Sequence, residues 1–203
     1  MIELNWNFFE KIPEGYGEAK VLLDIRKSWH QRLIQLSKGN VTEDGHILAF
    51  TEFLLSLQKH SPDHLKGSFS LVPDSDIESD ARVDFIYFPS YIAVAWLSLV
   101  KQNYYSLIKD KRGFGEVLRK GLRFICGRGL AGHGYDSDIE RIEAIEILYL
   151  GNVFSMVRAN PKLYAKFYRT MEKNREHLEK LDRKDGWGAV KEEDRIAALE
   201  MIS

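Results

Sequence analysis

The residue types best suited to acid–base chemistry lie in two short segments, "CGRGLAGHGYDSD" at residues 126–138 and "RVDFIYFPSY" at residues 82–91. Asp136 and Asp84 each precede a predicted helix, and the axes of neighbouring helices lie about 8 to 10 Å apart. Glycoside hydrolysis uses two carboxyl groups separated by roughly 5 to 9.5 Å. We therefore predict Asp84 and Asp136 as catalytic acid and base, with His133, which lies between two glycines, orienting the ligand or donating to it.

Aromatic residues close to these carboxylates are the predicted ligand-binding residues. Tyr87 and Phe88 lie in one segment, Tyr135 lies in the other, and Trp96 follows in the next predicted helix. Their rings offer large stacking surfaces. The favoured hypothesis is a glycosidase-like hydrolase that acts on a carbohydrate or on a similar polyhydroxylated small molecule.

A purely structural interpretation of the same carboxylates stays open. Ser137 with Glu140 three residues later forms a capping box, and aspartates at a helix start favour the helix dipole. Both predicted catalytic aspartates would then be simple N-terminal caps. His133 and Tyr135 are needed for no cap, so they are the residues that this alternative does not explain.

Cofactor and metal sites are not predicted. The four glycines at residues 126–138 match neither the dinucleotide nor the P-loop spacing, and no lysine follows them. His46, His60 and His64 flank one helix, but no HExxH motif or cysteine pair completes a metal-ligand set. The acidic run "DSDIESD" lacks the central glycine of a calcium loop.

The elements that must position these residues are helices. Apolar residues recur at spacings of three and four, and no segment alternates as a strand does. We predict an all-α fold with helices near 18–38, 46–60, 88–104, 114–127, 138–158, 161–181 and 191–202.

Internal similarity predicts stacked helix pairs. "RIEAIEIL" from Arg141 is echoed by "RIAALEMI" from Arg195 and more loosely by "YIAVAWLSL" from Tyr91. A glycine and an aromatic residue precede each copy, so that the glycine permits a sharp turn and the aromatic fills the gap between neighbours. We predict a single domain, 1–203, with an N-terminal helix at 18–38 and about three helix–turn–helix repeats at 46–104, 114–158 and 161–202. Chance similarity between helices is the alternative.

One segment carries a family resemblance. "FTEFLLSLQKHSPDHLKGSF", with Gln58, Gly67 and Phe69, resembles the QW repeat of the terpenoid cyclase and protein prenyltransferase superfamily. "VLRKGLRFICGRGLAGHGYDS" and "LEKLDRKDGWGA" resemble it without the glutamine. The resemblance implies an α/α toroid. Complete toroids of that family have about twice as many helix pairs, so the resemblance implies either a partial ring or a half that closes by pairing with another copy. The acidic cyclase motif is absent, so the resemblance does not carry over that catalysis.

The charge balance, the apolar runs and the cysteine content indicate which classes of partner and which compartment to expect. With 29 Lys and Arg against 30 Asp and Glu in 203 residues, bulk charge recruits neither nucleic acid nor an anionic membrane. The apolar run 91–100 is about half of the roughly 20 residues that span a bilayer, and the N-terminus lacks a secretory pattern. A single cysteine, Cys126, is expected to be a buried hydrophobe in a reducing compartment. We predict a cytoplasmic protein without nucleic-acid or membrane partners.

The sequence is compatible with three functions. The first is the hydrolase, the second is a noncatalytic helical repeat module that binds a protein or peptide, and the third is a binder of an isoprenoid-like apolar ligand. A closed polar pocket would favour the enzyme, whereas an open concave surface without converging carboxylates would favour a binding module. A homodimer is expected in each case, because terminal helix pairs expose apolar faces.

Overall fold

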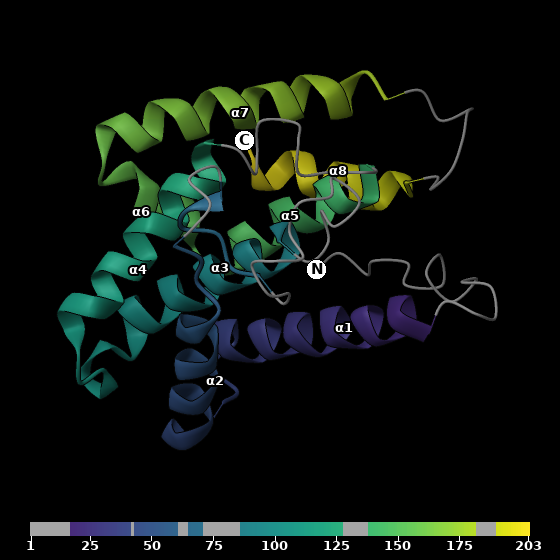
Figure 1. The fold of residues 1–203 in the computed structure, drawn as a ribbon. Coiled ribbons are helices and arrows are strands. Elements are labelled where there is room, and N and C mark those ends of the chain that lie inside the picture. The colour runs from purple at the N-terminus through teal and green to yellow at the C-terminus, as the bar shows by residue number, and fades with distance from the viewer. Residues whose placement is uncertain (1–16, 42, 61–64, 71–85, 128–137, 182–189) are drawn as a thin grey trace.

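The computed structural model describes residues 17–41, 43–60, 65–70, 86–127, 138–181 and 190–203. Within these ranges the chain forms helices and no sheet, so the all-α prediction is confirmed (Figure 1). The helices are α1 (Gly17–Ser37), α2 (Asp44–Ser56), α3 (Tyr87–Asn103), the short 3-10 helix η5 (Tyr105–Leu107), α4 (Lys111–Phe124), α5 (Asp138–Leu150), α6 (Val153–Arg158), α7 (Pro161–Glu179) and α8 (Glu192–Met201). No helix in these ranges has the length and apolar character needed to cross a membrane.

One predicted helix is broken. The sequence predicts a continuous helix over 138–158, but the structure divides it into α5 and α6. Gly151 packs so closely against Ala95 of α3 that a side chain there would overlap the Ala95 backbone, and Asn152 has a left-handed backbone with φ of 51°. The prediction was wrong because it considered only the apolar spacing, which continues through the break, and not the close approach of two helices.

The third helix is the centre of the fold. Every residue from Phe88 to Val100 is buried, and α1, α2, α4, α5 and α6 all pack against α3 (Figure 1). The most apolar run of the sequence is therefore the core of the domain. Two predicted repeat pairs, α2 with α3 and α7 with α8, are in contact. Helices α4 and α5, which form the predicted middle pair, both pack against α3.

A second layer lies over α5. This helix packs against α1, α3 and α8, and α7 packs against α6 and α8. A small apolar cluster joins α5, α7 and α8 through Ile142, Ile145, Leu178 and Ala198. Beside it, Asp138 at the start of α5 accepts a hydrogen bond from His177 of α7 at 2.7 Å. This contact fixes the first turn of α5, directly after the segment that carries the predicted catalytic Asp136.

The segment with the QW-like residues follows α2 in the chain and packs against α4. The side-chain amide of Gln58 donates to the Val117 carbonyl of α4 at 2.8 Å. Gly67 has φ of 92°, and a Cβ there would lie 2.6 Å from the Lys120 carbonyl oxygen. Phe69 is fully buried, with its ring 2.9 Å from where a Cβ would stand on Gly121. The predicted role of this aromatic as a plug between helices is confirmed, while the toroid stays a prediction.

Candidate functional site

The predicted catalytic residues are outside the structural description. Asp84, His133, Tyr135 and Asp136 all fall in ranges that the structure does not describe. Their convergence into an acid–base site therefore stays a prediction.

The three other predicted ligand-binding residues lie on α3, but they do not form one surface. Tyr87 stacks on Phe124 with ring centroids 5.8 Å apart. Phe88 is buried and packs against Trp29 at 6.4 Å, with the Arg26 guanidinium 4.9 Å from its ring centroid. Trp96 alone lines a described cavity, which is the candidate site.

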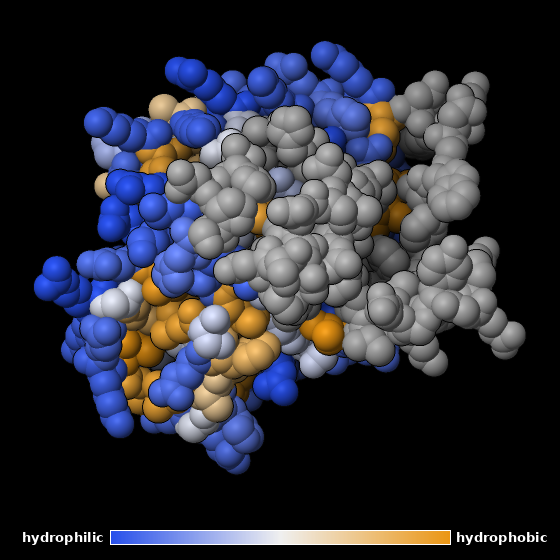
Figure 2. All heavy atoms as spheres, viewed as in Figure 1, coloured by the Kyte–Doolittle hydropathy of each residue, from blue (hydrophilic) through white to orange (hydrophobic). Residues whose placement is uncertain are grey.

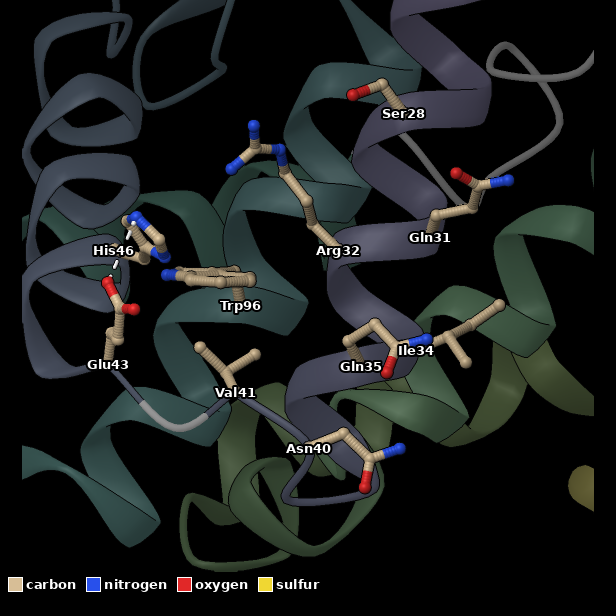
Figure 3. Close-up of a pocket in the computed structure, with 10 residues that line it drawn as sticks. All are labelled: Ser28, Gln31, Arg32, Ile34, Gln35, Asn40, Val41, Glu43, His46 and Trp96. Carbon is tan, nitrogen blue, oxygen red and sulfur yellow. Dashed lines mark ion pairs between the residues drawn. The ribbon is translucent and has the colours of Figure 1, made fainter.

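This cavity, the α1–α2 groove, is a hollow of about 680 Å³ between the first two helices (Figure 3). Its walls come from α1, from the α1–α2 connection and from the first turn of α2. Trp96 of α3 lies at the bottom. The lining residues are Ser28, Gln31, Arg32, Ile34, Gln35, Asn40, Val41, Glu43, His46 and Trp96.

Helical spacing explains the polar wall. Ser28, Gln31, Arg32 and Gln35 follow one another at intervals of three, one and three residues, which places them on one side of α1. The opposite stripe of α1, with Leu33 and Leu36 among its residues, is buried. The amphipathic pattern that buries one side of α1 thus presents polar groups to the groove on the other.

The groove is electrostatically mixed. Figure 3 shows the Arg32 side chain reaching from α1 toward α2, with His46 on the facing wall and Trp96 between them. His46 lies 3.4 Å from Glu43, and both side chains are mostly exposed. Glu43 is the one carboxylate among the lining residues. The groove therefore has no pair of converging carboxylates, although it has several groups that donate and accept hydrogen bonds.

An aromatic shelf, formed by Trp29, Phe50 and Phe53, adjoins the groove and shares Ser28, Arg32 and His46 with it. Trp29 meets Phe50 and Phe53 edge-on, each with ring centroids 5.6 Å apart. Phe53 is 43 % exposed, so its ring is accessible from solvent. The Arg32 guanidinium lies 5.3 Å from the Phe50 ring centroid, a cation–π contact that holds Arg32 at the junction of shelf and groove.

The indole of Trp96 is held from below. Its ring N–H donates to the Thr51 hydroxyl at 2.9 Å, and its ring meets Phe50 edge-on with centroids 4.7 Å apart. Trp96 is only 2 % exposed. Only a small part of the indole therefore reaches the floor of the groove, and the face of its ring is not open for a ligand to stack on.

A second polar feature, the buried ionic cluster, joins α1 to α5. Arg26 bonds Glu143 through one guanidinium nitrogen, and its other terminal nitrogen lies 3.3 Å from a carboxylate oxygen of Glu140. His30 Nε2 lies 3.4 Å from a Glu146 carboxylate oxygen. Arg26 is 2 % exposed and Glu146 is fully buried. Arg26 and His30 are four residues apart and lie on one side of α1. The three glutamates are spaced by three residues and lie on the side of α5 that faces them.

Burial controls the ionisation of His30. Desolvation lowers the pKa of its imidazole below 6.5, the nearby Glu143 carboxylate opposes this shift, and Arg26 adds to it. His30 is therefore neutral near pH 7 inside a cluster of charged groups. This cluster was not predicted from the sequence. The signal was present in "RIEAIEIL", where Glu143 and Glu146 recur every third residue among isoleucines that occupy all sides of a buried helix.

The described part of the chain contains no arranged set of metal ligands and no reactive thiol. No group of three or more potential ligands there is arranged to hold a metal ion. Cys126 is buried, as predicted, and burial raises the pKa of its thiol to about 12 despite the nearby Lys166 ammonium. A thiol with that pKa is neither a nucleophile nor a ready metal ligand at pH 7.

Comparison of the chain with protein-family models, with curated proteins and with solved structures found no match. Function is therefore inferred from the side chains of the α1–α2 groove and of the buried ionic cluster.

Proposed function

We propose that this protein is a noncatalytic binding module that holds a polyhydroxylated ligand, such as an oligosaccharide, in the α1–α2 groove. The observation that carries this proposal is the combination of polar walls with an adjoining aromatic shelf in one open hollow of about 680 Å³. A hollow of that volume accommodates a small molecule of this class.

The polar groups of the walls suit hydroxyl groups. Each amide of Gln31, Gln35 and Asn40 offers two N–H donors and one acceptor oxygen. A sugar hydroxyl also donates and accepts, so neighbouring hydroxyls on a ring can be matched by neighbouring amides. Arg32 adds further donors at the junction with the shelf, and Glu43 adds an acceptor on the opposite wall.

The aromatic shelf suits the apolar face of a sugar ring. Phe53 exposes 43 % of its surface beside Arg32 and His46. Burying such a ring against ligand C–H groups removes apolar surface from water, which is favourable by about 25 cal/mol per Å². Stacking and hydrogen bonding therefore have separate groups in this site, as recognition of a sugar requires.

The composition of the groove favours binding over hydrolysis. Two carboxyl groups about 5 to 9.5 Å apart are the usual requirement for glycoside hydrolysis. The lining residues include Glu43 as their one carboxylate, and His46 lies beside it at the exposed rim. The groove is open and lacks converging carboxylates, which is the feature expected of a binding module.

The test is a thermal-shift screen of the protein against a panel of oligosaccharides, followed by calorimetric titration of each hit. A ligand at 100 times its dissociation constant should stabilise the fold by about 2.7 kcal/mol. Gln35→Ala should weaken binding about fivefold and Arg32→Ala about tenfold or more, as expected for a neutral and for a charged hydrogen bond.

Asp24→Asn is the matched control, because Asp24 is exposed on α1 and does not line the groove. It should leave the dissociation constant unchanged. Hits whose binding survives both groove substitutions would place the ligand elsewhere and reject the proposal.

The glycosidase-like hydrolase is a second candidate. It is supported by the buried carboxylates Glu143 and Glu146, which lie on the helix that begins two residues after Asp136 and face His30. In that enzyme Asp84 and Asp136 are the acid and base, and His133 orients the substrate. Asp136→Asn should then reduce turnover of chromogenic glycosides roughly 100-fold while sparing the fold. Unimpaired turnover in this variant would eliminate the candidate.

We also propose that the helix pairs form a partial α/α toroid that a second copy completes. Ile196 of α8 is 45 % exposed, and an apolar contact of this side chain with a second copy would support the arrangement. Sedimentation of a strict monomer at high concentration would contradict this arrangement. The buried, unpaired Cys126 supports the further proposal of a reducing, cytoplasmic location.

A further inference from the structure

Arg32 is the one lysine or arginine among the described residues that line the α1–α2 groove. Its side chain is exposed and reaches from α1 toward α2 (Figure 3). It also lines the hollow over the aromatic shelf, so its guanidinium lies where the two parts of the proposed ligand site meet. A permanent positive charge in this position can select a ligand by its charge.

The N–H groups of this guanidinium are not used within the described part of the chain. There, no carboxylate lies within ion-pair distance of Arg32 and no acceptor receives a hydrogen bond from it. Arg26, on the buried side of the same helix, is by contrast bonded to Glu140 and Glu143. The five N–H donors of Arg32 are therefore left for water or for a ligand.

The aromatic shelf holds the guanidinium in place. Its central carbon lies 5.3 Å from the centroid of the Phe50 ring. Phe50 is itself fixed, because it is buried and meets Trp29 and Trp96 edge-on at centroid distances of 5.6 and 4.7 Å. A cation–π contact orients the planar group without using its N–H donors. Arg32 is thus oriented before a ligand arrives, which lowers the entropy that binding costs.

Phe53 provides an apolar surface close to this cation. Its ring stacks on Phe50 with centroids 6.0 Å apart, and it lines the same hollow as Arg32. Its ring is accessible to solvent, whereas that of Phe50 is buried. Figure 2 shows hydrophobic and hydrophilic residues side by side on the surface around α2, at the lower left of the view. A sugar ring placed against Phe53 can therefore direct a charged substituent toward Arg32.

The one described carboxylate of the groove does not occupy Arg32. Glu43 lies at the start of α2, and its carboxylate is 3.4 Å from His46 Nε2. One arginine neutralises one negative charge, and Glu43 repels further anionic groups. The charges of the groove thus suit a ligand that brings a single carboxylate, and they disfavour a chain with many negative charges.

We infer that the ligand of the α1–α2 groove is an acidic sugar, with one uronic-acid carboxylate bound by Arg32 and its ring stacked on Phe53. The inference rests on the proposed function of the groove and names the class of sugar within it. A guanidinium matches a carboxylate through two parallel N–H donors, and such charge-assisted bonds are about twice as strong as neutral ones. A sugar hydroxyl in the same place would leave the charge of Arg32 without a counter-charge.

The test compares acidic and neutral forms of one disaccharide by calorimetric titration at low ionic strength. The probes are a disaccharide with a terminal glucuronate, its methyl ester and the corresponding disaccharide with a terminal glucose, together with the equivalent set that ends in galacturonate. The members of a set differ only at the exocyclic carbon of the terminal ring. The ratio of their dissociation constants therefore isolates the carboxylate. In one set at least, the wild type should bind the acid about tenfold more tightly than the ester.

R32Q should remove this preference, so that acid and ester bind about equally, because glutamine keeps a polar group but has no charge. The preference of the wild type should also shrink as the ionic strength rises from about 0.01 to about 1 M, since the screening length then falls from about 30 to about 3 Å. R119Q is the matched control, because Arg119 is an exposed arginine of α4 that does not line the groove. It should keep the wild-type preference.

F53A separates the ring from the charge. It should weaken the binding of acid and ester alike by about fivefold, through the loss of apolar contact, and leave their ratio unchanged. Unchanged affinity of both probes in this variant would refute the stacking on Phe53. Circular dichroism of each variant checks that the helices are intact.

Two results would overturn the inference and leave the proposed function standing. One is equal binding of acid and neutral forms, with Gln35→Ala weakening both. The other is an R32Q variant that keeps the preference for the acid, since the carboxylate would then be bound elsewhere. Absence of binding by every probe would reject the acidic sugar, and absence of any hit in the wider oligosaccharide screen would reject the proposed function as well.

Discussion

Arg26 of α1 and Glu143 of α5 form a buried, charge-assisted hydrogen bond between positions 117 residues apart in the sequence. Phe88 of α3 covers the other side of the guanidinium. Helices α1, α3 and α5 therefore meet at one buried cation. Breaking this pair removes a contact and also leaves a carboxylate without its partner in a site of low dielectric constant.

Arg26→Leu should accordingly destabilise the protein by about 3 to 5 kcal/mol. Urea denaturation measures the loss as a lower midpoint with an unchanged slope. Arg112→Ala, which breaks the largely exposed pair with Glu116, is the control and should change stability by less than about 1 kcal/mol. In R26L/E143L, removal of both charges should restore much of the lost stability. A mild effect of Arg26→Leu alone would show that Glu143 is not held by this contact.

Stability should fall as the pH drops below 6.5, partly because of His30. Its pKa is lowered in the folded state by burial, so the unfolded chain binds a proton more readily. The contribution is complete above pH 6.5 and is lost as the pH falls toward the lowered folded value, with a slope of at most about 1.4 kcal/mol per pH unit. Glu143, Glu146 and Arg26 face this imidazole. His30→Gln should flatten the pH dependence of the urea midpoint in this window, and an identical profile would refute the assignment.

Gly67→Ala should destabilise the connection between α2 and α3. The backbone φ of 92° disfavours a side chain, and a Cβ there would lie 2.6 Å from the Lys120 carbonyl oxygen. We expect a loss of about 1 to 3 kcal/mol in the free energy of unfolding. Gly45→Ala is the matched control, since Gly45 lies in the first turn of α2 with open space around it. That substitution should be neutral or stabilising by about 0.4 to 1 kcal/mol.

Cys126 should be unreactive in the native protein. It is buried, and burial raises the pKa of its thiol to about 12. A thiol-specific chromogenic disulfide should react with it only at the rate at which the protein opens, and fully in denaturant. Rapid modification under native conditions would mean that the end of α4 is open to solvent.

Local spacing in the sequence was enough to predict the helices. The three-and-four recurrence of apolar residues located α1 to α4, α7 and α8 within a few residues of their observed ends. The apolar content of the sequence also identified the run 91–100 as the most apolar, and this run is the centre of α3. The role of Phe69 as a plug followed from its position after Gly67. These features depend on neighbours within a few residues, so the sequence contains the information that fixes them.

Only part of the candidate site was predictable in this way. Trp96, which the sequence predicts to bind a ligand, lines the floor of the groove, and its role in binding stays a prediction. The polar wall of α1 was not predicted, because Gln31 and Gln35 on an amphipathic helix look like ordinary solvent-exposed residues. The predicted catalytic residues Asp84, His133 and Asp136 lie outside the described residues, so the structure leaves their role as predicted.

The sequence by itself determined the helical periodicity, the apolar core of α3 and the sharp turn at Gly67. Tertiary structure alone decided that Arg26 meets Glu143, that Gly151 breaks a helix against Ala95, and that α1 and α2 leave a groove between them. Helix formation depends on hydrogen bonds four residues apart. The pairing of helix faces instead depends on burying apolar area from segments distant in the chain, and no local spacing encodes which partner will cover a given charge.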